Sequence, residues 1–169
     1  FALTCFCSAN RETGKITDGE YQAVRCYAAS MEAVFTKVRK LRWENFEVLK
    51  RLKGVMALYA ALSTELPKGL LYRIHSSGDF FSQDYFDAWL IVAKEFPARI
   101  FYAYTKAIPF WVKRLGQIPP NLILNASYGG KFDALIPVHK LKSVTIVSSE
   151  EEAKQLGLEI DNDDFLAYG

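Results

Sequence analysis

The sequence predicts an α/β fold in which a parallel sheet forms a partial, open (β/α) barrel. After residue 67, short apolar runs alternate with amphipathic segments, which is typical of parallel strands joined by right-handed helical crossovers. The chain has 169 residues, whereas a closed eight-stranded barrel needs about 250. We therefore expect one domain, 1–169, built from a cysteine-bearing loop (1–27), a helical pair (28–66) and βα repeats (67–169).

The composition narrows the class of protein. Half of the residues are apolar and 14% are aromatic, which suffices for a sizeable core. Apolar runs all fall short of the ~20 residues of a membrane helix, so we expect no membrane partner. The net charge of +2 argues against a nucleic-acid partner. Three cysteines, an odd number, do not suit a disulfide framework and favour a reducing cytoplasm.

The helical pair follows from the spacing of apolar residues. We expect one helix over 28–42 and a second over 44–62. In the second, apolar side chains recur at intervals of three and four, as on a buried helix stripe; they are Phe46, Leu49, Leu52, Val55, Met56, Tyr59 and Leu62. Pro67 and Gly69 end this unit. A start at Phe1 without methionine, and an end just after the strand-like run 165–168, indicate a chain trimmed at both ends.

Four strands are expected in the βα repeats, at 70–74, 99–104, 121–127 and 143–147, with a fifth near residues 1–4. Ser82 and Ser149 are suitable N-caps for helices over 83–96 and 150–156. A short helix through Trp111 and Leu115 lies between the second and third of these strands.

Polar residues end each of the four strands. In parallel α/β folds, ligands bind at the carboxyl ends of strands, so we expect a small-molecule pocket there. Its candidate residues are His75, Ser76, Ser77, Asp79, Tyr104, Thr105, Lys106, Asn125, Ser127, Ser148 and Ser149. The alternative is that these residues only cap the helices that follow.

Arg73 and His75 lie on the same strand face because side chains alternate along a strand. An inward arginine is costly unless it is paired, so Arg73 would hold an anionic ligand or contact a cofactor. A structural network with Asp79 is the alternative. Lys106 is a candidate phosphate contact or Schiff-base nucleophile; the alternative is a solvated charge at the end of a strand.

The three cysteines, Cys5, Cys7 and Cys26, cluster at the amino end. This clustering indicates one inorganic centre, because soft metals and iron–sulfur clusters select thiolates. Three thiolates leave one position of a four-iron cube without a cysteine. The spacing matches neither a zinc ribbon nor the C-x3-C-x2-C run of radical S-adenosylmethionine enzymes. A zinc site completed by His75, and three unrelated cysteines, therefore stay open as alternatives.

Four segments, 11–19, 25–33, 73–80 and 101–106, resemble the phage family called gene product eighty-eight. The blocks Arg-x-His-x-Ser-Gly-Asp-Phe and Phe-Tyr-Ala-Tyr-Thr-Lys are specific when they occur together. Members of this family resemble cut-down radical S-adenosylmethionine barrels. The resemblance implies that Cys5, Cys7 and Cys26 ligate a 4Fe-4S or 3Fe-4S cluster in the cytoplasm of the phage's host. It also places residues 73–79 and 104–106 at the barrel mouth.

The leading hypothesis is an iron–sulfur protein with redox or radical chemistry at an open iron, which would take the amino and carboxylate groups of S-adenosylmethionine. Its expected ligand-binding residues are Arg73, His75, Ser77, Asp79, Tyr104, Lys106 and Asn125. One alternative is a non-catalytic binding or redox-sensing module that contains a cluster. Another is a cluster-free α/β enzyme that uses His75, Asp79 and Lys106.

Overall fold

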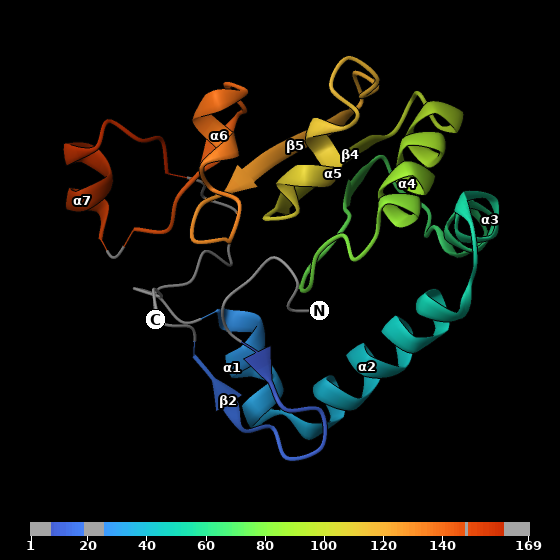
Figure 1. The fold of residues 1–169 in the computed structure, drawn as a ribbon, viewed down its shortest axis with the longest axis horizontal. Coiled ribbons are helices and arrows are strands. Elements are labelled where there is room, and N and C mark those ends of the chain that lie inside the picture. Colours follow the sequence, from blue (N-terminus) through green and yellow to red (C-terminus); the bar gives the residue numbers. More distant parts are fainter. Residues whose placement is uncertain (1–7, 19–25, 148, 161–169) are drawn as a thin grey trace.

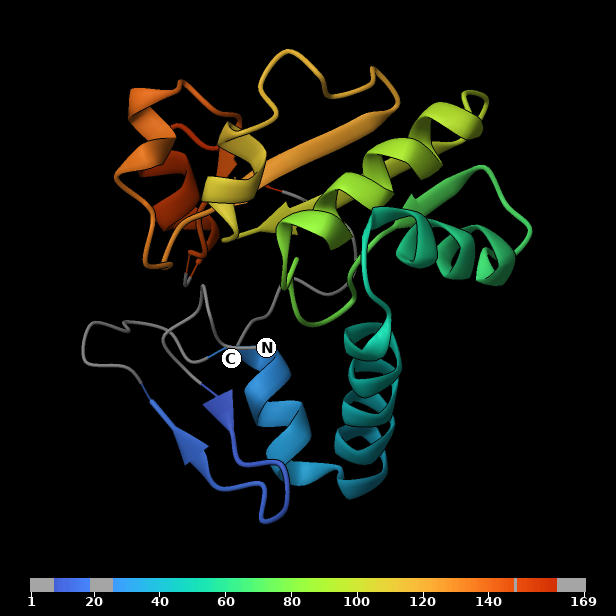
Figure 2. The ribbon, with the colours of Figure 1, turned by 45° about the vertical axis from the view of Figure 1, so that its right-hand side comes forward.

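The computed structural model describes residues 8–18, 26–147 and 149–160 (Figures 1 and 2). Its main body contains a four-stranded parallel sheet, whose strands lie in the order β3 (Leu71–Arg73), β4 (Ile100–Thr105), β5 (Leu122–Ser127) and β6 (Ser143–Val144). The prediction of an α/β fold with a parallel sheet is confirmed. Within the described residues the sheet ends at β3 and β6 and does not close into a barrel.

One face of this sheet carries the core. Tyr72, Phe101 and Leu122 are register partners on three adjacent strands and are all buried. They pack with buried side chains of the helices on that side, which are α4 (Gln83–Glu95), α5 (Ile108–Val112) and α6 (Leu135–Val138). A further helix, α3 (Val55–Glu65), packs against α4. The core therefore lies between the sheet and a single layer of helices.

The predicted helix caps are confirmed. Oγ of Ser82 accepts a hydrogen bond from the backbone N–H of Tyr85 at 3.1 Å, which begins α4. Oγ of Ser149 accepts one from Glu152 at 3.1 Å and begins α7 (Glu150–Gln155). Each serine satisfies a backbone donor that the first turn of a helix leaves without a partner.

The amino-terminal region differs from the prediction in two ways. The expected loop contains an antiparallel hairpin, β1 (Ser8–Ala9) and β2 (Ile16–Thr17). The expected helical pair is three helices, α1 (Tyr27–Val34), α2 (Thr36–Arg51) and α3, and the boundary that we placed at residue 43 lies inside α2. Gly54 begins α3 with φ of +79°, a conformation that other residues rarely adopt, so the chain turns there.

Arg39 fastens the hairpin to the helices. Arg39 is 6% exposed, and its guanidinium donates hydrogen bonds to the carbonyl oxygens of Arg11 (3.1 Å), Glu12 (3.2 Å) and Glu32 (2.5 Å). These bonds join the loop between β1 and β2 to α1 and α2. They hold the hairpin and α1 together as a unit that lies beyond the carboxyl ends of the sheet strands (Figure 2).

Several predicted features lie outside the described residues. They are Cys5, Cys7, Ser148, the strand expected near residues 1–4 and the run 165–168. In the part of the chain that the structure describes, we find no helix with the length and apolarity that a membrane crossing requires.

Candidate functional site

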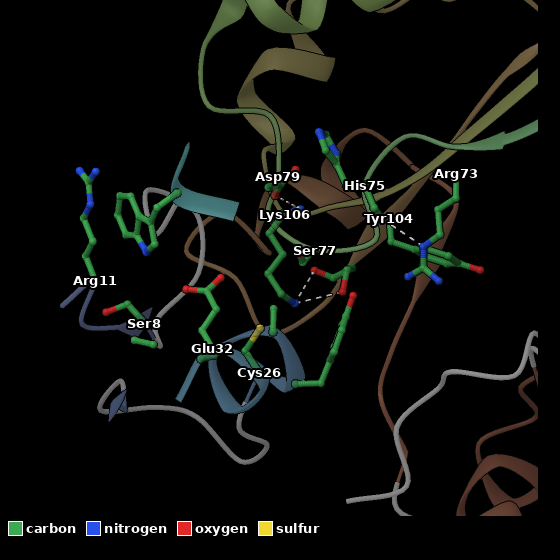
Figure 3. A pocket seen from close by; sticks show the side chains of 17 residues that line it. Ser8, Arg11, Cys26, Glu32, Arg73, His75, Ser77, Asp79, Tyr104 and Lys106 are labelled. Carbon is green, nitrogen blue, oxygen red and sulfur yellow. Dashed lines mark hydrogen bonds between the residues drawn. The ribbon is translucent and has the colours of Figure 1, made fainter. Parts of the chain in front are cut away.

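A cavity of about 430 Å³ opens between the strand ends and the amino-terminal unit (Figure 3). The sheet side contributes the ends of β3, β4 and β5 and the segment after β3, through Arg73, His75, Ser77, Gly78, Asp79, Tyr104, Lys106 and Ser127. The opposite wall comes from the hairpin, α1 and α2, through Ser8, Ala9, Arg11, Cys26, Tyr27, Ala28, Ala29, Glu32 and Trp43. Two regions far apart in the sequence thus meet around one space.

Most of the residues singled out in the sequence come together at this cavity. Arg73, His75, Ser77, Asp79, Tyr104 and Lys106 line its sheet side, and Cys26 lines the opposite wall. Asn125 does not line it: this residue is 6% exposed and is the register partner of Tyr104 on β5. The cavity therefore joins one predicted cluster ligand with most of the predicted ligand-binding residues.

The amino-terminal wall contains residues that the sequence reasoning missed. Glu32 is buried on α1, at positions three and four after Ala29 and Ala28, and all three line the cavity. A carboxylate on the same helix face as two alanines is a signal that could have identified it. Arg11 and Trp43 also line the wall, with the Arg11 guanidinium 5.3 Å from the centre of the Trp43 ring.

Asp79 joins the loop after β3 to the end of β4. Its Oδ1 accepts hydrogen bonds from Oγ1 of Thr105 (2.6 Å) and from the backbone N–H of Phe80 (2.8 Å). Its Oδ2 accepts one from the backbone N–H of Lys106 (2.8 Å). Both carboxylate oxygens of Asp79 thus accept hydrogen bonds from the protein itself, and these bonds fix the shape of the cavity floor.

Lys106 bridges the ends of β4 and β5. Its ammonium donates to the carbonyl oxygen (3.2 Å) and hydroxyl (3.0 Å) of Ser127 and to the carbonyl oxygen of Tyr128. An ammonium has three protons, and each has an acceptor in this arrangement. Lys106 therefore contributes a fixed positive charge at the cavity rather than a mobile nucleophile.

His75 is neutral at physiological pH. Burial lowers the pKa of its imidazole from 6.5 to about 4, because the charged form would lose its hydration. Its Nε2 lies 3.3 Å from the hydroxyl of Tyr85. Its ring packs edge to face against the Phe80 ring, with the two ring centres 4.8 Å apart. The buried Nδ1 has no hydrogen-bond partner in the described part of the chain, so it is available to a bound ligand or water.

Arg73 presents a cation to the cavity. Its Nε donates to the carbonyl oxygen of His75 at 3.1 Å, and its guanidinium lies 5.1 Å from the centre of the Tyr104 ring. These two contacts orient the side chain and leave its terminal nitrogens directed into the open space in Figure 3. Such a guanidinium is well suited to a carboxylate or phosphate.

The wall with Cys26 has a mixed charge. Burial raises the pKa of the Glu32 carboxyl, and the Arg42 guanidinium, 3.6 Å away, opposes this rise. Burial also raises the pKa of the Tyr27 hydroxyl, and Arg73 opposes this rise across the cavity. Cys26 itself stands at the N-cap position of α1.

The described residues contain no group of three His, Cys, Asp or Glu side chains that could hold a metal ion. Among the described residues that line the cavity, Cys26 contributes a thiol. A metal centre at this wall would therefore need ligands from outside the described ranges, where Cys5 and Cys7 lie.

A second cavity of about 350 Å³ lies between α2 and the segment after β3. His75, Ser77, Gly78 and Asp79 line both cavities, so this short segment forms the partition between them. The rest of the second cavity is lined by apolar side chains, among them Leu41, Phe46 and Phe81, and by Arg42, Asn45 and Ser76.

Comparison with known proteins places these features in a family. Residues 2–168 match the model of the family described as gene product 88. The chain is 33% identical over 90 residues to the Gene 88 protein of Mycobacterium phage D29, an alignment that covers 48% of this chain and 38% of that protein. It is 34% identical over 108 residues to the Gene 88 protein of Mycobacterium phage L5, which covers 59% of this chain and 45% of that protein.

These alignments span less than half the length of either curated relative. No solved structure matches the chain. The family model, in contrast, extends over nearly the whole sequence and includes both walls of the cavity. The chain belongs to the gene product 88 family.

Proposed function

We propose that this protein binds an iron–sulfur cluster through Cys5, Cys7 and Cys26, and that the cluster faces the cavity at the strand ends. One observation carries the proposal: Cys26 lines the same cavity as Arg73 and His75, although the sequence separates them by about 50 residues. A cysteine and an arginine thus share one ligand-sized space.

The donor chemistry of the wall fits such a cluster. Iron–sulfur clusters are held by cysteine thiolates, and Cys26, at the start of α1, lines the cavity. Cys5 and Cys7 are the only other cysteines of the sequence, so a cluster here requires both. When bound, the cluster would supply one-electron transfer and, with S-adenosylmethionine at an iron that lacks a cysteine, a start to radical chemistry.

The chain's own residues would bind and orient the ligand. Arg73 would hold its carboxylate or phosphate, because its Nε is already anchored and its terminal nitrogens face the cavity. The neutral imidazole of His75 would exchange a hydrogen bond with it through Nδ1. Asp79 and Lys106 would keep the floor rigid through their contacts to Thr105 and Ser127.

The first experiment is metal analysis of protein purified without oxygen. We expect a brown protein that contains iron and acid-labile sulfide and absorbs at about 400 nm. Cys5→Ser, Cys7→Ser and Cys26→Ser should each remove the iron. Ser8→Ala, which changes a small polar residue of the same wall, is the matched control and should retain it. Colourless protein, or protein that holds only zinc, would exclude the proposal.

A second experiment separates an enzyme-like site from a binding or redox-sensing module. Titration of the reduced cluster with S-adenosylmethionine should change its electron spin resonance signal if the ligand reaches an open iron. An unchanged signal with intact iron content would favour the module and remove the radical S-adenosylmethionine-like interpretation of the open sheet.

The cluster-free alternative makes a different prediction. An enzyme that uses His75, Asp79 and Lys106 would have normal activity after all three cysteine substitutions. The contacts of Asp79 and Lys106 to backbone groups disfavour it, because those groups would have to be released before either side chain reacted. His75→Ala should leave the iron content intact, whereas loss of iron would make His75 a ligand or an essential support.

A further inference from the structure

The second cavity is separate from the wall that carries Cys26. One face of α2 forms one side of it, through Val38, Leu41, Arg42, Asn45, Phe46 and Leu49. The segment 74–79, Phe81 and Tyr85 form the other side. Its volume of about 350 Å³ is within the range of small-molecule sites. The described residues that line it include no cysteine, so cluster binding gives this space no occupant.

Much of the wall of this cavity is apolar and held in place. The rings of Phe46 and Phe81 pack edge to face with their centres 5.3 Å apart, and Tyr85 stacks on Phe81 at 4.5 Å. Leu49 and Ile74 pack against the main core. Walls of this kind favour a ligand with an apolar body, because its burial removes apolar surface from water.

Arg42 brings a positive charge to the same cavity. Its side chain is 18% exposed, and its contacts with α1 both use Nη1, which lies 3.2 Å from the carbonyl oxygen of Ala28 and 3.6 Å from Oε1 of Glu32. The second distance is longer than a hydrogen bond. Among the described residues Nε and Nη2 of Arg42 have no acceptor. These two nitrogens can donate side by side to one carboxylate.

The carboxylate of the cavity wall does not take this role. Asp79 is the acidic residue among those that line the second cavity. Its two oxygens accept hydrogen bonds from Thr105 and from the backbone N–H groups of Phe80 and Lys106. An acceptor for Arg42 on this side therefore has to come from a bound molecule.

From this arrangement we propose that the second cavity binds a small hydrophobic carboxylic acid. The carboxylate of the ligand accepts hydrogen bonds from Nε and Nη2 of Arg42, and its apolar body packs against Phe46, Leu49 and Phe81. A wholly apolar molecule would cover the guanidinium without giving it an acceptor. A small polar anion would leave the apolar walls in contact with water. The body can be a ring or a short alkyl chain, because both offer the same chemistry.

The test is isothermal titration of the whole chain, purified without oxygen, with phenylacetate and with hexanoate. We expect one site per chain and a Kd of about 1 mM or tighter for at least one of them. The tighter of the two identifies a ring or a chain as the preferred body. Acetate lacks the body, and phenylacetamide lacks the charge, so each should bind at least about tenfold more weakly than phenylacetate. Phenylacetamide that binds as tightly as phenylacetate would overturn the proposal.

Arg42→Gln tests the charge that the ligand needs. This variant should weaken phenylacetate binding roughly 10- to 100-fold, as expected for the loss of charge-assisted hydrogen bonds, and should leave phenylacetamide binding within about threefold. Arg51→Gln, at an exposed position of the same helix that lines neither cavity, is the matched control and should bind both probes like the parent chain.

Asn45→Phe tests the space without touching the contacts of Arg42. Asn45 is exposed and lines the cavity, so a phenyl ring there should fill part of the cavity and weaken phenylacetate binding at least about tenfold. Val48→Phe places the same ring on α2 at a side chain that is 60% exposed and lines neither cavity, and it should not change binding. Thermal melting of each variant separates a lost site from a lost fold.

Arg73→Gln determines which cavity holds the ligand, because the first cavity also contains a guanidinium. It should leave phenylacetate binding unchanged. Loss of binding in Arg73→Gln but not in Arg42→Gln would place the ligand in the first cavity and overturn the proposal. So would the absence of saturable binding of either acid at about 10 mM. None of these measurements depends on iron, so the proposal stands or fails separately from cluster binding.

Discussion

Oγ1 of Thr105 donates a 2.6 Å hydrogen bond to Oδ1 of Asp79 and itself accepts one from the backbone N–H of Ala107 at 2.9 Å. Thr105 is 1% exposed, so its hydroxyl lies away from solvent at the end of β4. The backbone N–H of Lys106 completes the contact with Oδ2 of Asp79. The partition between the two cavities is thus fixed to the sheet by one carboxylate.

Asp79→Asn should destabilise the fold. The amide would place a donor where the carboxylate accepts from Thr105 or from Lys106, so a partly buried donor would lose its partner. We expect a loss of about 1 to 3 kcal/mol in the free energy of unfolding, measured by urea denaturation. Asp133→Asn is the control, since Asp133 also accepts from two backbone N–H groups, those of Gly129 and Gly130, but in a partly exposed turn. Equal losses in both variants would contradict the role given to Asp79.

Arg39→Lys should loosen the amino-terminal unit. Lysine keeps the charge but cannot reach the three carbonyl oxygens that the guanidinium fork serves. We expect a lower melting temperature and faster amide hydrogen exchange in residues 8–17. Lys40→Arg, at a neighbouring side chain that is 77% exposed, should change neither. Unchanged exchange in Arg39→Lys would show that the hairpin is held by other contacts.

Gly14→Ala should disturb the same amino-terminal unit, because Gly14 lies in the hairpin loop next to the Arg39 guanidinium. A Cβ at Gly14 would lie 2.3 Å from Nη1 of Arg39, and the φ of +72° is unfavourable for alanine. Gly116→Ala provides the control for backbone conformation, because its φ is +79° but its Cβ would meet no atom within 4 Å. We expect Gly14→Ala to lower the melting temperature more than Gly116→Ala does. The reverse order would show that the guanidinium adjusts without loss.

His75 should make the stability depend on pH between about 4 and 6.5. Its pKa is lowered in the folded protein, so the unfolded chain binds more protons in this range. Stability from this group is therefore complete above pH 6.5 and is lost as the pH falls towards 4, by up to about 3 kcal/mol. The measurement is urea denaturation across this range for the parent chain and for His75→Gln, which should show a smaller slope. Identical slopes would mean that the imidazole is not protected from protonation.

Strands, helices and caps of the βα repeats could be predicted from the sequence because their causes are local. On β4 every second side chain is buried, as at Phe101 and Ala103, and Ser82 caps the first turn of α4. Both effects depend only on residues within a few positions in the sequence. The helix break at Gly54 was also local, but the apolar spacing on either side of it obscured the signal. The hairpin β1–β2 was missed because its strands are two residues each, too short to show a pattern.

Local patterns in this chain specified a parallel sheet, polar strand ends and a cluster of thiols near one end, since each depends on the chemistry of neighbouring residues. Long-range packing selected which of these groups share a cavity. Arg39 draws the hairpin and α1 together, and this unit brings Cys26 and Glu32 to face Arg73. Asn125 has the same polarity as its neighbours at the strand ends but is buried beside Tyr104, because contacts across strands, not its own sequence context, set its exposure.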